Sequence, residues 1–408
     1  MLTPVHSESA PMVKEPGPRV AGIVSTEFLL AAVVTTDATP SAIRGKAMSK
    51  ASNLICALQA ARRLAQEVTT DIPCFGTRLL RLGSLYAALT LAAPANAEGV
   101  KLFEVPTPDS YPESVTISSD GAIWFTEKQG NKIGRLAPDG RLDEFSIPTQ
   151  DSRPQGIVVG PDRNLWFTEN RGNKLGRITP AGEISEFPLS TPESYPFGIA
   201  VGPDGALWFT LSGTNRIGRG TVDGRVSEFE LAKTLTPYGI TTGPDGNLWF
   251  TGFNSNTIGR ITPAGQVAEF PLSTSDSAPQ NIVSGPDGGL WFTEAAADAV
   301  GRITTDGRIT EFALPSCLPS SPSEDGRPPR CTSTKSPYGI AASKDGLWVT
   351  QHCGGRLSRL TSDGRFTEVS LNGLRAPNGI AVDHDDTVWF ALARSNGIGR
   401  YRPESNGR

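Results

Sequence analysis

The 408-residue sequence has little cysteine and histidine and no excess of basic charge. Its five cysteines are too few for a disulfide scaffold, and 42 Asp and Glu residues outweigh 38 Lys and Arg residues, giving a net charge of −4. Such a chain has no basic face that would attract nucleic acid or an anionic membrane surface. We therefore expect no nucleic-acid partner and no membrane association of the mature chain, and we expect a monomer.

Glycine and proline, by contrast, are abundant, with 44 and 33 residues. Together with 38% hydrophobic and 20% charged residues, they indicate a soluble globular chain that turns often. Length alone would allow two or three ordinary domains, although propellers use that length for one body.

The longest uncharged apolar run is short and has the features of an export signal. It reads LGSLYAALTLAAP over residues 82–94, follows Arg78 and Arg81, and is followed directly by Ala-Asn-Ala ending at Ala97. A basic flank, a short apolar stretch and an A-x-A ending together predict a secretory signal peptide over residues 77–97. The run is too short for a comfortable membrane span, and a buried core helix is the alternative. We expect a periplasmic or secreted protein that begins after Ala97.

Residues 1–76 precede this signal and show neither a repeat nor a sustained apolar period. They are expected to be a mis-called or poorly ordered N-terminal extension without function. The alternative is a genuine cytoplasmic extension, in which Leu54 to Val68 would form one amphipathic helix. Residues 98–408 are then the mature domain.

The mature domain is built from a repeated unit that contains one tryptophan. The tryptophans are spaced by 42, 42, 41, 42, 57 and 41 residues: Trp124, Trp166, Trp208, Trp249, Trp291, Trp348 and Trp389. One unit, residues 195–231, has four short apolar runs separated by glycine, Pro-Asp-Gly or Asn-containing turns. A unit of about 40 to 45 residues with four antiparallel strands is typical of a propeller blade. The fold class predicted is therefore all-β, a seven-bladed β-propeller of four-stranded antiparallel blades.

The two ends of the repeat array complement each other. The last unit lacks its outermost strand, while Val100 to Val105 resembles the fourth-strand phrase EFPL of the other units. We predict that this N-terminal strand of the mature chain closes the ring and leaves no free sheet edge at the seam.

One long spacing between tryptophans marks an insertion loop over residues 315–335. The loop is rich in proline and serine and carries Cys317 and Cys331 at its ends. In an oxidising compartment these two cysteines are well placed for a local disulfide, with Cys353 as a competing partner. The two remaining cysteines precede the predicted signal.

In a repeat protein, a residue present in every blade serves the blade, whereas a functional site must be asymmetric. Arginines recur once per blade, at Arg135, Arg177, Arg219, Arg260, Arg302, Arg359 and Arg400. We interpret them, like the tryptophans, as packing and blade-to-blade hydrogen bonding, with a ring that binds an anion as the alternative.

Two positions vary from blade to blade while their neighbours vary less. One follows the proline before each first strand and the other follows each WFT-like phrase, and both are expected to rim the central channel. With two residues close to them, they define a candidate ligand-binding set: Glu113, Glu127, Arg153, Gln155, Glu169, Tyr238, Gln280, Glu294, Tyr338, Gln351, His352 and Asn378. Its carboxylates could hold a hard divalent cation or could be solvated acids around a wet channel.

The phrases GPDGNLWFT, NKIGRL, TPAGEISEFPL and TPESYPFGI closely resemble those of the virginiamycin B lyase family, also called streptogramin B lyases. The resemblance covers Val100 to Tyr401. It implies a seven-bladed propeller that opens a cyclic depsipeptide antibiotic by elimination at its ester linkage. It also implies a histidine general base and magnesium held by glutamates, groups suited to removing a carbon-bound proton and stabilising the enolate-like oxygen.

The sequence departs from the family pattern at four positions. Tyr338 and Asn378 stand where the resemblance implies histidines, and Ala376 and Ala393 stand where it implies glutamates. No catalytic residue and no metal ligand is therefore assigned, and magnesium enters only through the resemblance.

Three hypotheses follow. The favoured one is an exported propeller that binds a small molecule, a peptide or a glycan at the channel mouth. The second is an active magnesium-dependent carbon-oxygen lyase with relocated groups, His352 with Glu294, Glu127 and a metal. The third is a periplasmic protein-interaction propeller.

Overall fold

The computed structural model describes residues 99–232, 235–315, 335–361 and 364–403. This part of the chain forms 28 strands and no helix, so the described residues offer no helix that could cross a membrane. The predicted N-terminal extension, the signal over residues 77–97, and the Cys317 and Cys331 pair all lie outside the described residues. Cys353 is disulfide-bonded.

The strands form seven four-stranded sheets, and all strand pairs are antiparallel. The innermost strands are β2 (Pro112–Ile117), β6 (Pro154–Val159), β10 (Pro196–Val201), β14 (Pro237–Thr242), β18 (Pro279–Ser284), β22 (Pro337–Ser343) and β26 (Pro377–Val382). The second strands are β3 (Ile123–Glu127), β7 (Leu165–Glu169), β11 (Leu207–Leu211), β15 (Leu248–Gly252), β19 (Leu290–Glu294), β23 (Gly346–Gln351) and β27 (Val388–Leu392). The third strands are β4 (Lys132–Leu136), β8 (Lys174–Ile178), β12 (Arg216–Gly220), β16 (Thr257–Ile261), β20 (Ala299–Ile303), β24 (Arg356–Thr361) and β28 (Gly397–Tyr401). The outermost strands are β5 (Leu142–Ser146), β9 (Ile184–Pro188), β13 (Val226–Glu230), β17 (Val267–Pro271), β21 (Ile309–Ala313), β25 (Phe366–Ser370) and β1 (Val100–Glu104).

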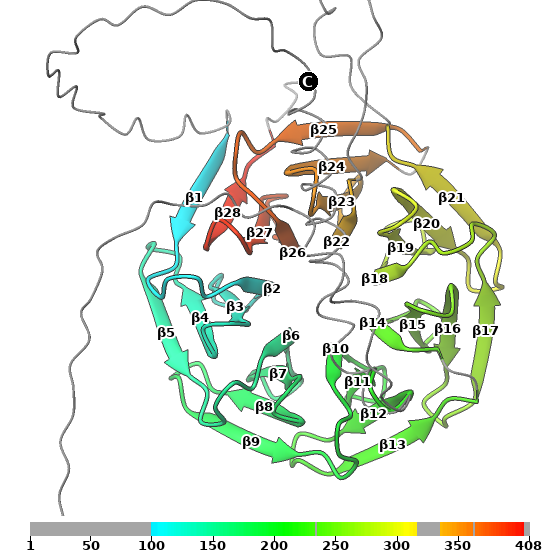
Figure 1. Cartoon of the computed structure of the whole chain (residues 1–408), viewed down its shortest axis with the longest axis horizontal. Coiled ribbons are helices and arrows are strands. Elements are labelled where there is room, and N and C mark those ends of the chain that lie inside the picture. The colour runs from blue at the N-terminus through cyan, green and yellow to red at the C-terminus, as the bar shows by residue number, and fades with distance from the viewer. Residues whose placement is uncertain (1–98, 233–234, 316–334, 362–363, 404–408) are drawn as a thin grey trace, which may run out of the picture. The chain divides into compact units, whose positions relative to one another are not determined.

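The seven sheets are arranged as blades around a centre, with the innermost strands facing it (Figure 1). Each innermost strand contacts the next one along the chain, and the last, β26, contacts the first, β2. The blades therefore form a closed ring, and the predicted seven-bladed propeller is confirmed.

Each blade is packed by the residues that recur in the sequence. In the third blade, Trp208 is fully buried and stacks on Phe229 with ring centroids 5.4 Å apart. Its indole Nε1 donates to Asp204 of the Pro-Asp-Gly turn at 3.0 Å, and Arg219 lies over the indole and donates to the same carboxylate at 2.7 Å. Ring stacking, a hydrogen bond and a cation–π contact therefore stabilise the packing around one tryptophan.

The same stacking places an arginine over a tryptophan in six blades, with Arg135, Arg177, Arg219, Arg260, Arg302 and Arg400. The packing role predicted for these arginines is confirmed. Their hydrogen bonds lie mainly within one blade rather than between blades, because the acceptor aspartates belong to the turn beside the stacked tryptophan.

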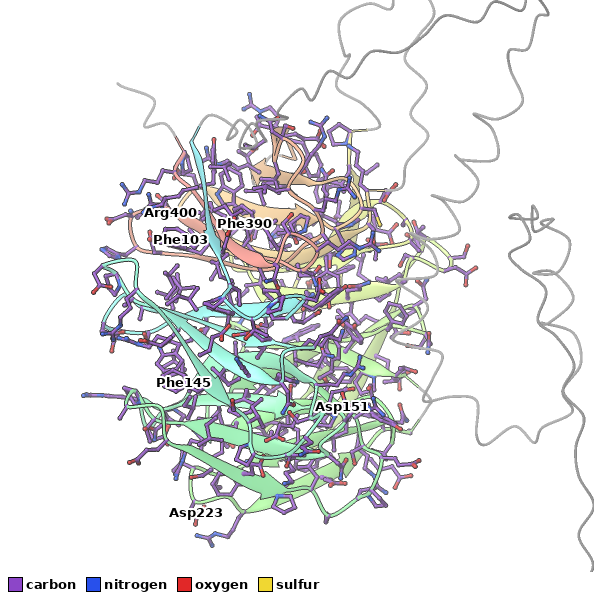
Figure 2. All side chains as sticks on the ribbon, turned by 60° about the vertical axis from the view of Figure 1, so that its left-hand side comes forward. Phe103, Phe145, Asp151, Asp223, Phe390 and Arg400 are labelled. Carbon is purple, nitrogen blue, oxygen red and sulfur yellow. The ribbon has the colours of Figure 1, made fainter. Side chains whose placement is uncertain are left out.

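The seam closes as predicted, because β1 completes the sheet of β26, β27 and β28. β1 pairs antiparallel with β28 from Val100 opposite Tyr401 to Glu104 opposite Gly397. Phe103 and Arg400 lie together there, with the guanidinium 5.7 Å from the ring centroid (Figure 2).

The side chain of an asparagine hydrogen-bonds across the seam in the same way as the equivalent asparagine does between two consecutive blades. Asn396 accepts hydrogen bonds from the backbone N and the hydroxyl of Ser110, at 2.8 and 2.9 Å, and donates to the Thr107 carbonyl at 2.8 Å. Asn131 makes equivalent bonds with Ser152, at 2.7 and 2.8 Å. The chain ends of the ring are thus joined by the same contacts that join covalently continuous blades.

We expect Asn396→Ala to lower the free energy of unfolding by about 1–3 kcal/mol, because it leaves buried groups of Ser110 unpaired. Asn131→Ala is the matched control within the ring and should cost a similar amount. Urea titrations followed by tryptophan fluorescence measure both. If Asn396→Ala left the free energy of unfolding unchanged while Asn131→Ala lowered it, the Asn396 hydrogen bonds would not stabilise the seam.

Candidate functional site

One mouth of the ring is formed where the innermost strands begin. Each strand starts with a proline, and the residue after it differs from blade to blade: Glu113, Gln155, Phe197, Tyr238, Gln280, Tyr338 and Asn378. In five blades the next residue is glycine, which allows neighbouring strands to approach closely. A Cβ on Gly239, for example, would lie 2.4 Å from the carbonyl oxygen of Gln280.

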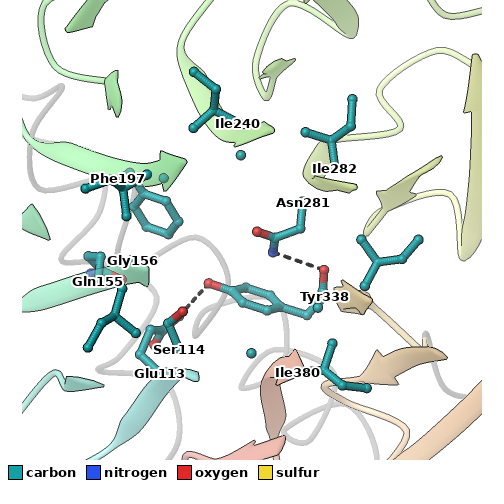
Figure 3. Close-up of a pocket in the computed structure, with 17 residues that line it drawn as sticks. Glu113, Ser114, Gln155, Gly156, Phe197, Ile240, Asn281, Ile282, Tyr338 and Ile380 are labelled. Atoms are coloured by element: carbon teal, nitrogen blue, oxygen red, sulfur yellow. Dashed lines mark hydrogen bonds between the residues drawn. The ribbon is translucent and has the colours of Figure 1, made fainter. Parts of the chain in front are cut away.

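A cavity of about 130 Å³ that opens to solvent lies between these strands. Six isoleucines line its deeper wall: Ile157, Ile199, Ile240, Ile282, Ile340 and Ile380. Glu113, Gln155, Phe197, Asn281 and Tyr338 line it nearer the strand starts, and Figure 3 shows the Tyr338 side chain reaching across toward Glu113. An apolar cavity with a few convergent polar groups is the usual form of a small-molecule site.

Glu113 is the centre of a buried polar cluster at this mouth. The Tyr338 hydroxyl donates to Glu113 Oε1 at 2.5 Å, and Asn378 Nδ2 donates to Oε2 at 3.2 Å. Lys128 Nζ lies 3.4 Å from the same Oε2, and His352 Nδ1 lies 2.5 Å from Asn378 Oδ1. These five residues come from the first, sixth and seventh blades. The structure therefore brings together four of the predicted ligand-binding residues and adds Lys128.

The environment of the cluster keeps its aromatic and imidazole groups neutral. Burial, and secondly the charge of Glu113, raise the pKa of Tyr338 well above its usual value, so its hydroxyl remains a donor. Burial lowers the pKa of His352, although the bond to Asn378 and the charge of Glu113 oppose this. Glu113 is thus contacted by the neutral donors Tyr338 and Asn378 and by Lys128.

The third and fourth blades present a different surface to the mouth. Tyr238 stacks on Phe197 with ring centroids 3.6 Å apart and on Phe253 at 5.4 Å. Phe197 is half-buried and lines the cavity. The third and fourth blades therefore give the mouth an aromatic surface, and Tyr238 joins it to Tyr338 and Glu113 of the polar cluster.

The glutamates after the WFT phrases are not on the rim, contrary to expectation. Glu127, Glu169, Glu294 and also Gln351 are fully buried and do not line the cavity. Side chains alternate along a strand, so the prediction was one residue out, and an error of one residue selects the opposite face. Lys128 and His352, which follow Glu127 and Gln351, contact the polar cluster at the mouth instead. Counting this alternation is the signal that could have revealed Lys128 and Phe253.

The other predicted residues are placed as follows. Gln155 lines the cavity, and Gln280 is buried at 3% exposure, each with a side-chain Oε1 that has no hydrogen-bond partner among the described residues. Arg153 is not a lining residue, and its guanidinium instead pairs with Asp151 at 2.9 Å.

Each buried glutamate at the end of a second strand faces a glutamate of the outermost strand. Burial, and secondly the charge of Glu144, raise the pKa of Glu127 to about 8. In the sixth blade Gln351 occupies this position, and its amide donates to Glu368 at 2.8 Å. Both carboxyl oxygens of Glu127 lack a hydrogen-bond partner among the described residues, and the raised pKa favours the neutral acid, which could donate to Glu144 as Gln351 donates to Glu368.

The same arrangement recurs in two more blades. Burial, followed by the charge of Glu186, raises the pKa of Glu169 to about 8, and burial, followed by the charge of Glu311, raises that of Glu294 to about 7. All three side chains are fully buried, and their raised pKa values favour neutral acids, which attract a cation less than carboxylates do.

The residues at the mouth do not fit the magnesium ion that the resemblance implies. Ala376 and Ala393 are buried at 4% exposure and offer no oxygen ligand from their side chains. Glu113, the carboxylate in the cluster, is already bonded to Tyr338, Asn378 and Lys128. Hard divalent cations need several oxygen ligands, which this set does not supply.

Among the described residues, one group of three has metal-ligand spacing, formed by Asp383, His384 and Asp385. It lies just beyond the end of β26, at the opposite end of that strand from Asn378. It is therefore separate from the mouth.

Fold and site together define a closed seven-bladed propeller with an asymmetric mouth that combines apolar and polar side chains. The sequence model of the Virginiamycin B lyase family matches residues 96–322, so the chain belongs to that family.

Solved structures of the family are similar to the whole ring. Virginiamycin B lyase from Staphylococcus aureus is 37% identical, with a TM-score of 0.67, covering 74% of this chain and 98% of that one. A catalytically inactive histidine-to-alanine variant of the same enzyme with quinupristin has 37% identity, the same coverage and a TM-score of 0.68. The virginiamycin B lyase of Bacillus licheniformis is 47% identical over 38 residues, which are 9% of this chain and 13% of that protein.

Proposed function

We propose that this protein is an exported propeller that binds a small molecule, a peptide or a glycan at the channel mouth. We further propose that it does not open type B streptogramins at the rate of the family. The observation that carries the proposal is that the residues at the family's two histidine positions are hydrogen-bonded to a carboxylate and cannot serve as bases. Tyr338 and Asn378 stand at the family's histidine positions and are bonded to Glu113. Neither group can accept a carbon-bound proton near neutral pH.

The two sides of the mouth support binding of a ligand with an apolar ring and a polar part. Phe197 and the stacked Tyr238 offer an aromatic surface, and the cluster around Glu113 offers hydrogen-bonding groups. Such a division orients a ligand, since the ring gains contact area on one side and polar groups are paired on the other.

Loss of the aromatic surface tests this proposal. At least one member of a panel of quinupristin, linear peptides and oligosaccharides should raise the melting temperature of the wild type. Phe197→Ala should raise the Kd of that ligand about tenfold or more, which corresponds to a loss of about 1.4 kcal/mol of binding free energy from stacking and contact. The control is Val222→Ala, which alters an exposed side chain away from the cavity. Equal affinities of both variants would place binding elsewhere.

A second candidate is a lyase with relocated groups, which His352 favours. This neutral imidazole lies beside Asn378 at the mouth and could act as a base. The grouping of His352 with Glu127 and Glu294 that the sequence suggested is not part of this candidate, because both glutamates are fully buried in other blades.

Export completes the proposal. The protein purified from the periplasm or the medium should begin near Glu98, because the A-x-A ending predicts cleavage after Ala97. Intact-mass measurement decides this, and retention of residues 1–97 would contradict it. Peptide mapping without reduction would also show whether Cys317 pairs with Cys331 or whether one of them is joined to Cys353, which is disulfide-bonded.

We also propose a monomer. Val222 and Val267, each 36% exposed, are the exposed large hydrophobic residues in the described part of the chain, so no apolar patch is formed there.

A further inference from the structure

His352 has a defined tautomer, which follows from the bonds around Asn378. The Asn378 side chain has one donating and one accepting end, and its Nδ2 donates to Glu113 Oε2 at 3.2 Å. A carboxylate only accepts, so this end of the amide must be the donor. The other end, Oδ1, lies 2.5 Å from His352 Nδ1 and can only accept. The imidazole therefore carries its proton on Nδ1.

A neutral imidazole protonated on Nδ1 has an unprotonated Nε2 with a free electron pair. No described residue hydrogen-bonds to His352 Nε2, and this atom is not among the fully buried polar atoms that lack a partner. Since the residue retains 8% exposure, Nε2 opens to solvent at the mouth. The ring lies 6.0 Å from that of Tyr338, which lines the cavity.

We infer that His352 is the hydrogen-bond and proton acceptor of this mouth, positioned by the chain Glu113, Asn378 and His352. The site would then recognise a ligand with an N–H or O–H donor directed at Nε2. This inference rests on the proposed function, because it names the ligand group that the mouth receives. Three buried residues set one tautomer, which a histidine with only a packing role does not require.

The charges around the ring favour the neutral state of this acceptor. Burial lowers the pKa of His352, and the nearby cations Arg394 and Lys128 act in the same direction. The carboxylate of Glu113 and the bond to Asn378 oppose them. The acceptor is therefore available at neutral pH.

The tautomer can be measured without any ligand. The full chain has three histidines, so ¹⁵N-labelled imidazoles give few signals, and His384→Gln and His6→Gln assign the other two. Correlation of ring nitrogens with ring protons at neutral pH should show protonated Nδ1 and unprotonated Nε2 for His352. Asn378→Asp keeps an acceptor and should keep this tautomer, whereas Asn378→Ala should shift it toward Nε2–H.

Protonated Nε2 in the wild type, or an unchanged tautomer in Asn378→Ala, would overturn the inference. If Asn378→Ala does not fold, Glu113→Gln replaces it, because a glutamine can donate and would no longer set the direction of the Asn378 amide. Neither result depends on whether a ligand has been found, so failure here is distinct from failure of the proposed function.

Ligand recognition is tested with two variants at one position. For any ligand that stabilises the wild type, His352→Phe keeps a ring but removes the acceptor and should weaken binding more than tenfold. His352→Gln keeps an acceptor and should lose less. Equal losses would reduce His352 to a packing role.

Discussion

The propeller will be markedly less stable at pH 9 than at pH 6, because three buried glutamates must hold a proton in the folded state. Burial first, and the facing carboxylates second, raise the pKa of Glu127 and Glu169 from 4.5 to about 8 and that of Glu294 to about 7. A raised pKa in the folded state stabilises the fold fully below the unfolded value, and this contribution is lost as pH rises through the folded value. Stability should therefore fall between about pH 4.5 and 8 and level off above the folded-state pKa values.

Each pKa unit corresponds to about 1.4 kcal/mol, but partial relaxation of the blades reduces the effect. We expect a loss on the order of 1–3 kcal/mol per glutamate, and a drop in melting temperature of about 2–4 °C for each kcal/mol. Unfolding by urea at pH 6, 7, 8 and 9, followed by tryptophan fluorescence, measures this.

Substitution by glutamine supplies the matched test, since the sixth blade already carries Gln351 bonded to Glu368. The double variant Glu127→Gln and Glu169→Gln should flatten the pH dependence and be more stable than the wild type at pH 9. Gln351→Glu should steepen it. Glu230→Gln, at a side chain 77% exposed, is the control. A wild type whose stability does not change between these pH values would refute the pairing.

Unmodified protein incubated with quinupristin and magnesium will open the ring at least about 10²–10⁴-fold more slowly than a virginiamycin B lyase, the range that a missing general base costs. The Asn378 amide does not titrate in the useful range, and burial raises the pKa of Tyr338. Ala376 and Ala393 supply no anionic ligand for a cation. Mass spectrometry follows ring opening, with the Staphylococcus aureus enzyme as the positive control.

Restoration of the family residues sharpens this test. The combined variant Tyr338→His, Ala376→Glu, Asn378→His and Ala393→Glu should gain ring-opening activity, while no single change should. The four groups act on one elimination step, so their effects are not additive. Rapid magnesium-dependent turnover by the unmodified protein would refute the proposed function. Loss of this turnover in His352→Ala would then identify His352 as the base.

The repeat unit made most of the fold predictable, because a blade is built from contacts that are close in sequence. Recurrent tryptophans, Pro-Asp-Gly turns and alternating apolar runs specify hairpins, and seven copies leave a ring as the way to bury their faces. The seam was predictable for the same reason, since Val100 to Val105 carries the pattern of the strand that the last blade lacks. The packing role of the recurrent arginines followed from their presence in every blade, whereas their hydrogen bonds lie mainly within a blade and not between blades as predicted.

The orientation of individual side chains was decided only in the tertiary structure. The register of each inner hairpin shifts just after the proline, as between Pro112 and Val115, so Pro112 lies opposite Glu127 while Glu113 belongs to the bulge. The sequence does not mark this bulge, so the faces of the residues around Glu113 could not be assigned from it, and an error of one residue moves a side chain to the other face. Glu127, at the end of the regularly paired β3, was expected on the rim but lies inside the blade, because side chains alternate along the strand.

By itself, the sequence determined the blade, the number of blades and the way they close, because these depend on short-range periodicity. Only the tertiary structure decided the site. Closure of the ring brings Glu113 within 2.5 Å of Tyr338 and within 3.2 Å of Asn378, although 225 and 265 residues separate them in the chain. Contacts between the first and the last blades have no periodic signature, and they arise because a circular arrangement makes the ends of the chain neighbours.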